Sequence, residues 1–132
     1  MSLFENKPNH EYFSALKHKH ALMLLARNSD NILIACKIGY QYSDDVFYSW
    51  IGGVHPKFRE HGIAQYLMHM QHKWCLNHHY RLIRTKTLIN NSIMYAINVK
   101  NGFSVIGNDV SGKHGPKLIY SKLLSSNPED QI

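Results

Sequence analysis

The sequence VHPKFREHGIA, residues 54–64, connects a segment typical of a β-strand to one typical of an α-helix. Before it, residues 46–54 are rich in aromatic and β-branched side chains. After it, apolar side chains recur at steps of four, three and four residues, at Ile63, Leu67, Met70 and Trp74. We therefore predict a strand over residues 46–54 and a helix over residues 62–77, with this apolar stripe facing the core.

Residues 81–87 form the next predicted strand. Because a helix connects it to the strand over residues 46–54, the two strands are expected to pair in parallel through a right-handed crossover. Adjacent glycines near the end of a strand weaken its ladder, so Gly52 and Gly53 are expected to mark the place where the strand bulges or opens.

Turn-forming residues divide the rest of the chain into short elements. Two strands before residue 46 are expected to form antiparallel hairpins, over residues 21–26 and 32–42. A second helix, residues 91–101, is predicted to end at Gly102. The other expected elements are a short helix over residues 11–19 capped by Asn9 and strands over residues 103–106 and 117–124.

This order of elements predicts an α+β fold, with a mixed α/β sheet of about six mostly antiparallel strands, flanking helices and one parallel βαβ pair. A length of 132 residues and a hydrophobic content of 44% fit one globular domain over residues 1–132. The polar residues 125–132 are expected to form a flexible tail.

The composition limits the binding partners and the cellular location that we expect. A formal charge of +6 favours an anionic partner. No apolar stretch is long enough to cross a membrane and no secretory signal is present, so we expect no membrane partner and a cytoplasmic location. Cys36 and Cys75 are far apart and are expected to be reduced, and the ten histidines show no metal-binding spacing, so no metal is expected.

The start of the predicted helix at residue 62 is a candidate phosphate site. Its first backbone N–H groups lack partners inside the helix, and the helix dipole adds partial positive charge there. Gly62 lets a ligand approach the backbone closely, and Arg59 can add a charge-assisted contact. The alternative is that Gly62 only begins the helix and Arg59 is solvated.

This segment resembles motif A of the GNAT superfamily of N-acetyltransferases, which has a bulged strand, a valine, a turn containing proline and then R-x-x-G-x-A, matched by Arg59, Gly62 and Ala64. Downstream, Asn91 precedes Gly102 and Phe103 at the interval of motif B. The two motifs together cover about residues 46–106. The usual first strand and first helix of the family, which help to wall the acceptor site, are expected to be missing, so the fold would be shortened at the N-terminus.

The resemblance implies that the chain binds acetyl-CoA as co-substrate. It implies that loop amides bind the pyrophosphate and that the backbone around Gly53 and Val54 binds the thioester carbonyl and the pantetheine arm. The residues expected to bind acetyl-CoA are Gly53, Val54, His55, Arg59, Glu60, His61, Gly62, Ile63, Ala64, Gln65, Asn91 and Met94.

On a helical wheel, the second helix has a mixed polar face that contains Asn91, Met94, Tyr95 and Asn98. The opposite face, with Ile93, Ala96 and Ile97, is expected to pack on the sheet. The polar face is then free to line a ligand groove. The alternative is that Asn91 only caps the helix and that Asn98 is exposed to solvent.

The resemblance also implies a group that assists the leaving thiolate. The family's usual residue is a tyrosine four positions before the Gly-Phe pair, where this chain has Asn98, which can donate a hydrogen bond but not a proton. We expect Asn98 to stabilise the thiolate by a hydrogen bond. Tyr95, one turn earlier, and water remain alternatives as proton donors.

The acceptor side of the predicted site contains no obvious base, because residues 46–54 include no carboxylate. The distant candidates are Asp44, Asp45, Glu5 and Glu11, and deprotonation through water is another possibility. Tyr48 and Trp50 share one face of their strand and are candidates for binding the acceptor. The alternative is that both aromatic rings belong to the core.

Together these features favour an N-acetyltransferase that acts on a small-molecule or peptide amine, and a homodimer is possible. A noncatalytic acyl-CoA-binding module is the first alternative. A basic nucleic-acid-binding protein is the less favoured alternative, because no recognised module for nucleic acid is present.

Overall fold

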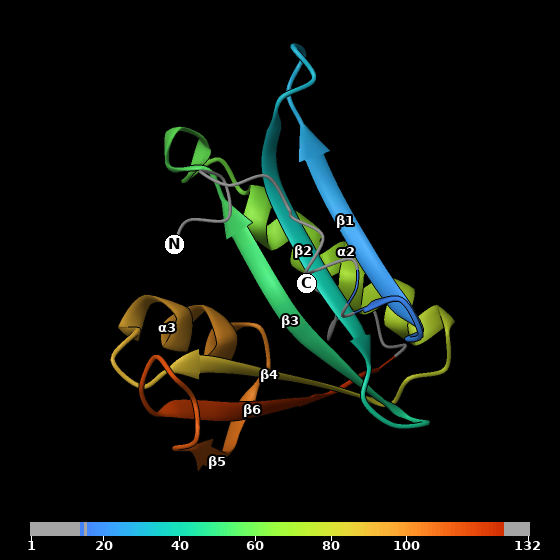
Figure 1. The fold of residues 1–132 in the computed structure, drawn as a ribbon, viewed down its shortest axis with the longest axis vertical. Helices are drawn as coiled ribbons and strands as arrows, with labels where there is room; N and C mark the ends of the chain where they lie inside the picture. The colour runs from blue at the N-terminus through green and yellow to red at the C-terminus, as the bar shows by residue number, and fades with distance from the viewer. Residues whose placement is uncertain (1–13, 15, 126–132) are drawn as a thin grey trace.

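The computed structural model describes residue 14 and residues 16–125. Its strands form one six-stranded sheet in the order β1-β2-β3-β4-β6-β5 (Figure 1). The elements in chain order are β1 (Ala21–Arg27), β2 (Leu33–Gln41), β3 (Val46–Val54), the 3₁₀ helix η1 (Pro56–Phe58), α2 (Ile63–Asn77), β4 (Leu82–Leu88), α3 (Ser92–Lys100), β5 (Ser104–Asp109) and β6 (Lys117–Leu123).

The predicted fold class is confirmed. β1, β2 and β3 pair antiparallel, β3 and β4 pair in parallel, and β4, β6 and β5 pair antiparallel. The observed ends of the elements lie within about three residues of the predicted ones. Of the helix predicted over residues 11–19, residues 14 and 16 are helical and residues 17–19 form a turn and bend. Residues 11–13 and 15, and residues 126–132 of the predicted tail, fall outside the described residues.

The pairing between β3 and β4 is short. It joins residues 46–49 to residues 82–85 and then stops, although both strands continue. At the last pair the Thr85 hydroxyl donates a hydrogen bond to the Ser49 carbonyl oxygen, at 3.0 Å. Beyond this point the two strands separate, and α3 lies toward the open end of the gap between the ribbons (Figure 1).

A bulge in β3 lies where the strands separate. Ile38 of β2 pairs with Ile51, whereas the next residue, Gly39, pairs with Ser49, so Trp50 is the extra residue. A Cβ atom on Gly39 would lie 2.6 Å from the Tyr48 carbonyl oxygen and would also overlap the Phe47 ring. The strand therefore bulges before the Gly52-Gly53 pair that the sequence indicated, because the space for the bulge comes from a glycine on the neighbouring strand.

The core fills both faces of the sheet. On the face covered by α2, Met68 and Cys75 pack with Phe47 of β3 and Ile83 of β4. On the opposite face, Cys36 and Ile38 of β2 pack with Leu16 and with partly buried aromatic rings. Both cysteines are buried and unbonded, as expected. Within the described part of the chain, no helix is long and apolar enough to cross a membrane.

The inward face of α2 differs from the predicted stripe. Leu67 is buried, but Met70 is 40% exposed. Two polar residues, Gln71 and His72, take the inward positions beside Met68 and Cys75. The helix is therefore rotated so that part of its buried surface is polar.

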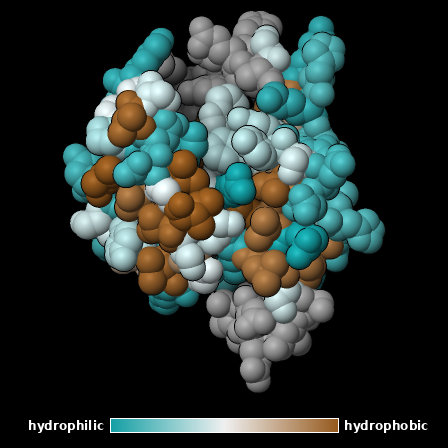
Figure 2. All heavy atoms as spheres, turned by 90° about the horizontal axis from the view of Figure 1, so that it is seen from below, coloured by the Kyte–Doolittle hydropathy of each residue, from teal (hydrophilic) through white to brown (hydrophobic). Residues whose placement is uncertain are grey.

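The predicted aliphatic face of α3 is confirmed only at Ile97, which packs against the core, whereas Ala96 is exposed. Asn98 and Asn101 are buried at 1% and 6% exposure, whereas Ile93 is 73% exposed. The Asn101 side chain forms two hydrogen bonds with the Gln65 side chain of α2, and this contact turns the polar side of α3 inward. Figure 2, a view from below, shows hydrophobic residues exposed on the side of the molecule where α3 and β5 lie.

The Gly39→Ala substitution tests the bulge. The added methyl group has no room beside the Tyr48 carbonyl oxygen, so we expect the free energy of unfolding to fall by about 1–3 kcal/mol, or more if the bulge is lost. Chemical denaturation measures the change. The matched control is Gly107→Ala in β5, whose new methyl group would lie 4.0 Å from the nearest atom. Equal losses for the two variants would contradict a special requirement at residue 39.

Candidate active site

The loop between β3 and α2 leaves the start of the helix open. Gly62 is the N-cap residue and has a left-handed backbone, with φ of 77°. The first helical hydrogen bond runs from the Tyr66 N–H to the Gly62 carbonyl oxygen, so the N–H groups of residues 63–65 have no acceptor inside the helix. Within the described residues no side chain caps this end, and a Cβ atom on Gly62 would meet nothing within 4 Å.

Arg59 lies beside this helix start. Its Nε–H donates to the Val54 carbonyl oxygen, at 3.1 Å, which ties the side chain to the end of β3. Its terminal guanidinium nitrogens have no acceptor among the described residues. His55 accepts a bond from the Lys57 N–H through Nδ1 and thereby caps η1. The loop thus presents one cation and several N–H groups to the same space.

The other loop residues on the predicted site differ in exposure. Glu60, His61 and Ala64 are exposed, and Glu60 also has a left-handed backbone, with φ of 68°. Ile63 packs inward with Leu67. The side chain of Gln65 already forms hydrogen bonds with Asn101, the C-cap residue of α3, so only its backbone N–H is available to a ligand.

The start of α3 fits the capping interpretation of Asn91. Its side-chain oxygen accepts a hydrogen bond from the Met94 N–H, at 3.1 Å. Gly102 follows the helix with φ of 90°, as predicted for a residue that ends a helix. The Asn91 side chain therefore positions α3, and a contact with acetyl-CoA remains a prediction for both Asn91 and Met94.

The two candidate catalytic residues of α3 lie in different surroundings. Asn98 is 1% exposed, and its amide nitrogen has no hydrogen-bond partner among the described residues. Tyr95 is 46% exposed. A buried amide donor without an acceptor costs free energy, and a role of Asn98 in assisting the thiolate remains a prediction.

Tyr48 and Trp50 lie together on the sheet face opposite α2. The ring of Tyr40 contacts both of them, with centroid distances of 5.4 Å to Tyr48 and 5.8 Å to Trp50. All three rings are only partly buried, so they are neither fully core nor fully exposed. A role in binding the acceptor remains a prediction.

Residues 46–54 contain no carboxylate, but a carboxylate of another strand pairs with β4. Asp109 of β5 pairs with Lys86 of β4, at 2.8 Å. The hydrogen bond from Lys86 and two from Ser111 hold the pKa of Asp109 well below its usual range. Sequence alone gave no signal for this pair, because β6, which follows β5 in the chain, lies between β4 and β5 in the sheet.

Lys37 of β2 lies beside Gly52 on the face covered by α2. Its ammonium nitrogen lies 3.5 Å from where a Cβ atom of residue 52 would be. Burial lowers the pKa of Lys37 to about 8, and the described residues offer it no acceptor or counterion. On α2, burial and the nearby lysines Lys122 and Lys37 lower the pKa of His72 to about 3, so this ring is neutral.

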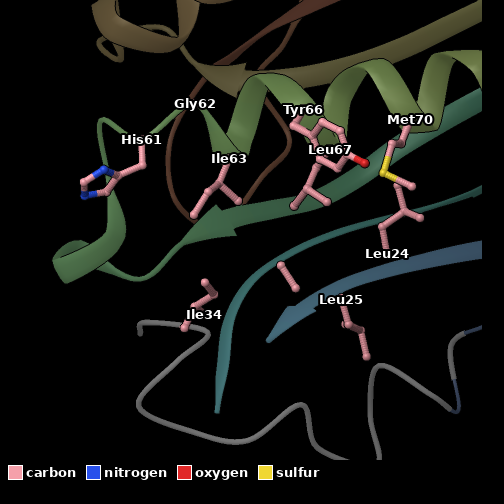
Figure 3. Close-up of a pocket in the computed structure, with 10 residues that line it drawn as sticks. Leu24, Leu25, Ile34, His61, Gly62, Ile63, Tyr66, Leu67 and Met70 are labelled. Atoms are coloured by element: carbon pink, nitrogen blue, oxygen red, sulfur yellow. The ribbon is translucent and has the colours of Figure 1, made fainter. Parts of the chain in front are cut away.

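A separate apolar hollow of about 630 Å³ opens beside the same helix start. It lies between α2 and the strands β1 and β2, with Tyr66 and Met70 on one wall and Leu24 and Ile34 on the other (Figure 3). His61 and Gly62 form its rim, so it shares the loop with the candidate phosphate site. No residue of β4 lines it, and it is therefore distinct from the gap between β3 and β4.

The model of the Acetyltransferase (GNAT) domain family matches residues 3–85. The match covers more than half of the chain, and it includes β3, the loop and α2. The chain therefore belongs to the GNAT acetyltransferase family. A comparison with curated proteins gives no match.

Solved structures of GNAT enzymes share the fold. A GNAT family acetyltransferase from Elizabethkingia anophelis with acetyl-CoA bound has a TM-score of 0.78 at 17% identity, over 92% of this chain and 88% of that one. The IAA acetyltransferase from Bacillus cereus has a TM-score of 0.79 at 13% identity, over 92% and 89%. The ribosomal-protein-S18-alanine N-acetyltransferase from Escherichia coli has a TM-score of 0.75 at 15% identity, over 92% and 80%.

The Lys37→Met substitution tests the burial of Lys37. Because the folded pKa lies below the unfolded value of 10.5, the folded state disfavours the charged form. The resulting loss of stability is complete below pH 8 and disappears as the pH rises toward 10.5. We expect Lys37→Met to raise the free energy of unfolding at pH 7 by about 2 kcal/mol and to have much less effect near pH 10.5. Urea denaturation at both pH values measures this, and an equal effect at both would contradict it.

Proposed function

We propose that the chain is an N-acetyltransferase that passes the acetyl group of acetyl-CoA directly to an amine. The family supports acetyl transfer, and one structural neighbour was solved with acetyl-CoA bound. The proposal rests on the open start of α2 beside Arg59. This helix start follows the end of β3, and one edge of β3 has no parallel partner after Ser49.

The N–H groups of residues 63–65 and the free end of Arg59 would hold the diphosphate of acetyl-CoA. The partial charge of the helix start and the guanidinium both favour a dianionic group. The separated edge of β3, residues 50–54, would offer its backbone groups to the amides of the pantetheine arm, because no described strand pairs with that edge.

The reaction needs an amine nitrogen to attack the thioester carbonyl carbon while the carbon–sulfur bond breaks. The acetyl group moves straight to nitrogen, and the proton lost by the amine leaves through water or a nearby base. Asn98 would donate its unpartnered N–H to the departing sulfur, and the backbone near Gly53 would polarise the carbonyl. No covalent bond to the chain forms.

One observation favours a noncatalytic acyl-CoA-binding module as the second candidate. Asn98 stands where the family's usual acid is a tyrosine, and its side chain is almost fully buried. Release of free CoA thiol from acetyl-CoA in the presence of an amine panel separates the two functions. Binding of acetyl-CoA without thiol release would support the module.

The Arg59→Gln substitution tests the diphosphate site. Loss of a charge-assisted contact is expected to weaken acetyl-CoA binding about tenfold or more in calorimetry. Acetyl-pantetheine, which has no diphosphate, should bind the variant and the wild type equally. The control is Lys57→Gln in η1, an exposed cation two residues away. An equal loss for both ligands, or for both variants, would argue against a specific grip on the diphosphate.

The Asn98→Ala substitution tests the thiolate donor. We expect kcat to fall by about tenfold or more while the Kd of acetyl-CoA changes little, because the hydrogen bond strengthens only as sulfur gains charge. Tyr95→Phe is the companion variant, and its kcat should stay near that of the wild type if Asn98 or water serves the thiolate. If Asn98→Ala lowered kcat and the affinity for acetyl-CoA by equal factors, Asn98 would contribute to binding only.

A further inference from the structure

On the face of the sheet opposite α2, side chains of both strands flank the point where β3 and β4 separate. Phe47 and Ile83 pack against α2, so their neighbours Tyr48 and Arg84 point to the other face by strand alternation. Trp50 and Lys86 are the first residues of each strand beyond the last pair. An acceptor that approaches the separated strands from this face therefore passes these side chains.

Arg84 on this face has no acceptor for its guanidinium among the described residues. Its Nε atom is buried and without a hydrogen bond. The guanidinium carbon lies 5.6 Å from the centre of the Tyr42 ring. A guanidinium without an acceptor is costly, and an anion bound to its two terminal nitrogens would offset part of that cost.

The other charges of this face leave it positive. The Lys19 ammonium lies over the Tyr40 ring at 4.2 Å, and Lys86 is paired with Asp109. Among the described residues of this face, three cations, Lys19, Arg84 and Lys86, thus accompany one carboxylate, Asp109. This excess repels a polyamine and attracts an anion.

The tyrosines of the face add neutral donors. Burial is the main cause that raises the pKa of both Tyr40 and Tyr48, so both phenols keep their protons at neutral pH. Neither hydroxyl has a hydrogen-bond partner within the described chain. Each can therefore donate to an oxygen atom of a ligand that lies along the strands.

We infer that the acceptor is an amine that also carries an anionic group, a carboxylate or a phosphate, and that Arg84 binds this group. The inference rests on the proposed acetyl transfer. Arg84 lies one residue before Thr85, the last residue of β4 that pairs with β3, so the anion would lie next to the point where the strands separate. Aminoalkanoates, dipeptides and aminoalkyl phosphates are amines of this class.

Matched acceptors test the inference by thiol release with saturating acetyl-CoA. The pairs are 4-aminobutanoate beside 4-aminobutanamide, glycylglycine beside glycylglycinamide, and phosphoethanolamine beside ethanolamine, with putrescine as a dication. The first two pairs test a carboxylate and the third a phosphate. We expect at least one anionic member to exceed its neutral partner about tenfold in kcat/KM, even though the neutral partner has the less basic amine.

In the Arg84→Gln variant, the ratio of kcat/KM between the anionic acceptor and its neutral partner should fall close to one. The kcat/KM for the neutral partner and the KM for acetyl-CoA should stay near their wild-type values. Arg84→Lys should keep part of the preference, because it keeps the charge without the bidentate fork. Lys113→Gln, an exposed cation in the loop after β5, is the control and should keep the full ratio. High salt should lower the wild-type ratio.

The outcomes separate the inference from the proposed function. Turnover of putrescine or of the neutral members at rates equal to or above those of the anionic members overturns the inference and leaves acetyl transfer standing. An equal loss for both members of a pair in Arg84→Gln also overturns it. No thiol release with any amine overturns the proposed function and, with it, the inference.

Discussion

The hydrogen bonds between β3 and β4 end at Ser49 and Thr85, and the other features of the site depend on where they end. Past this pair, β3 keeps its partner β2 but no described strand covers its other edge. The bulge at Trp50 begins the separation, and Gly39 on β2 gives the room for it. A glycine outside the recognisable motifs thus controls the geometry of the site.

Several polar side-chain atoms are buried without a hydrogen-bond partner. The Asn98 amide nitrogen, both polar atoms of the Gln71 side chain and the Arg84 Nε atom are buried without partners among the described residues. Lys37 adds a buried ammonium with a lowered pKa beside Gly52. A buried polar group without a partner costs free energy, so these residues lower the stability of the fold.

The sequence predicted the elements well because their signals are local. Helical spacing located α2, the Asn91 cap and Gly102 bounded α3, and the helical connection indicated the parallel pair. Prediction from the sequence failed where tertiary contacts determine which side chains are buried or paired. Pairing of Gln65 with Asn101 turned the polar side of α3 inward, and the ion pair of Lys86 with Asp109 joins strands that are distant in sequence.

A crystal structure with acetyl-CoA tests the central claim most directly. The account predicts the diphosphate on the N–H groups of residues 63–65 beside Arg59, and the pantetheine arm along residues 50–54 of β3 between the separated strands. Acetyl-CoA bound elsewhere, for example in the apolar hollow between α2 and β1 with its diphosphate away from Gly62, would contradict the account.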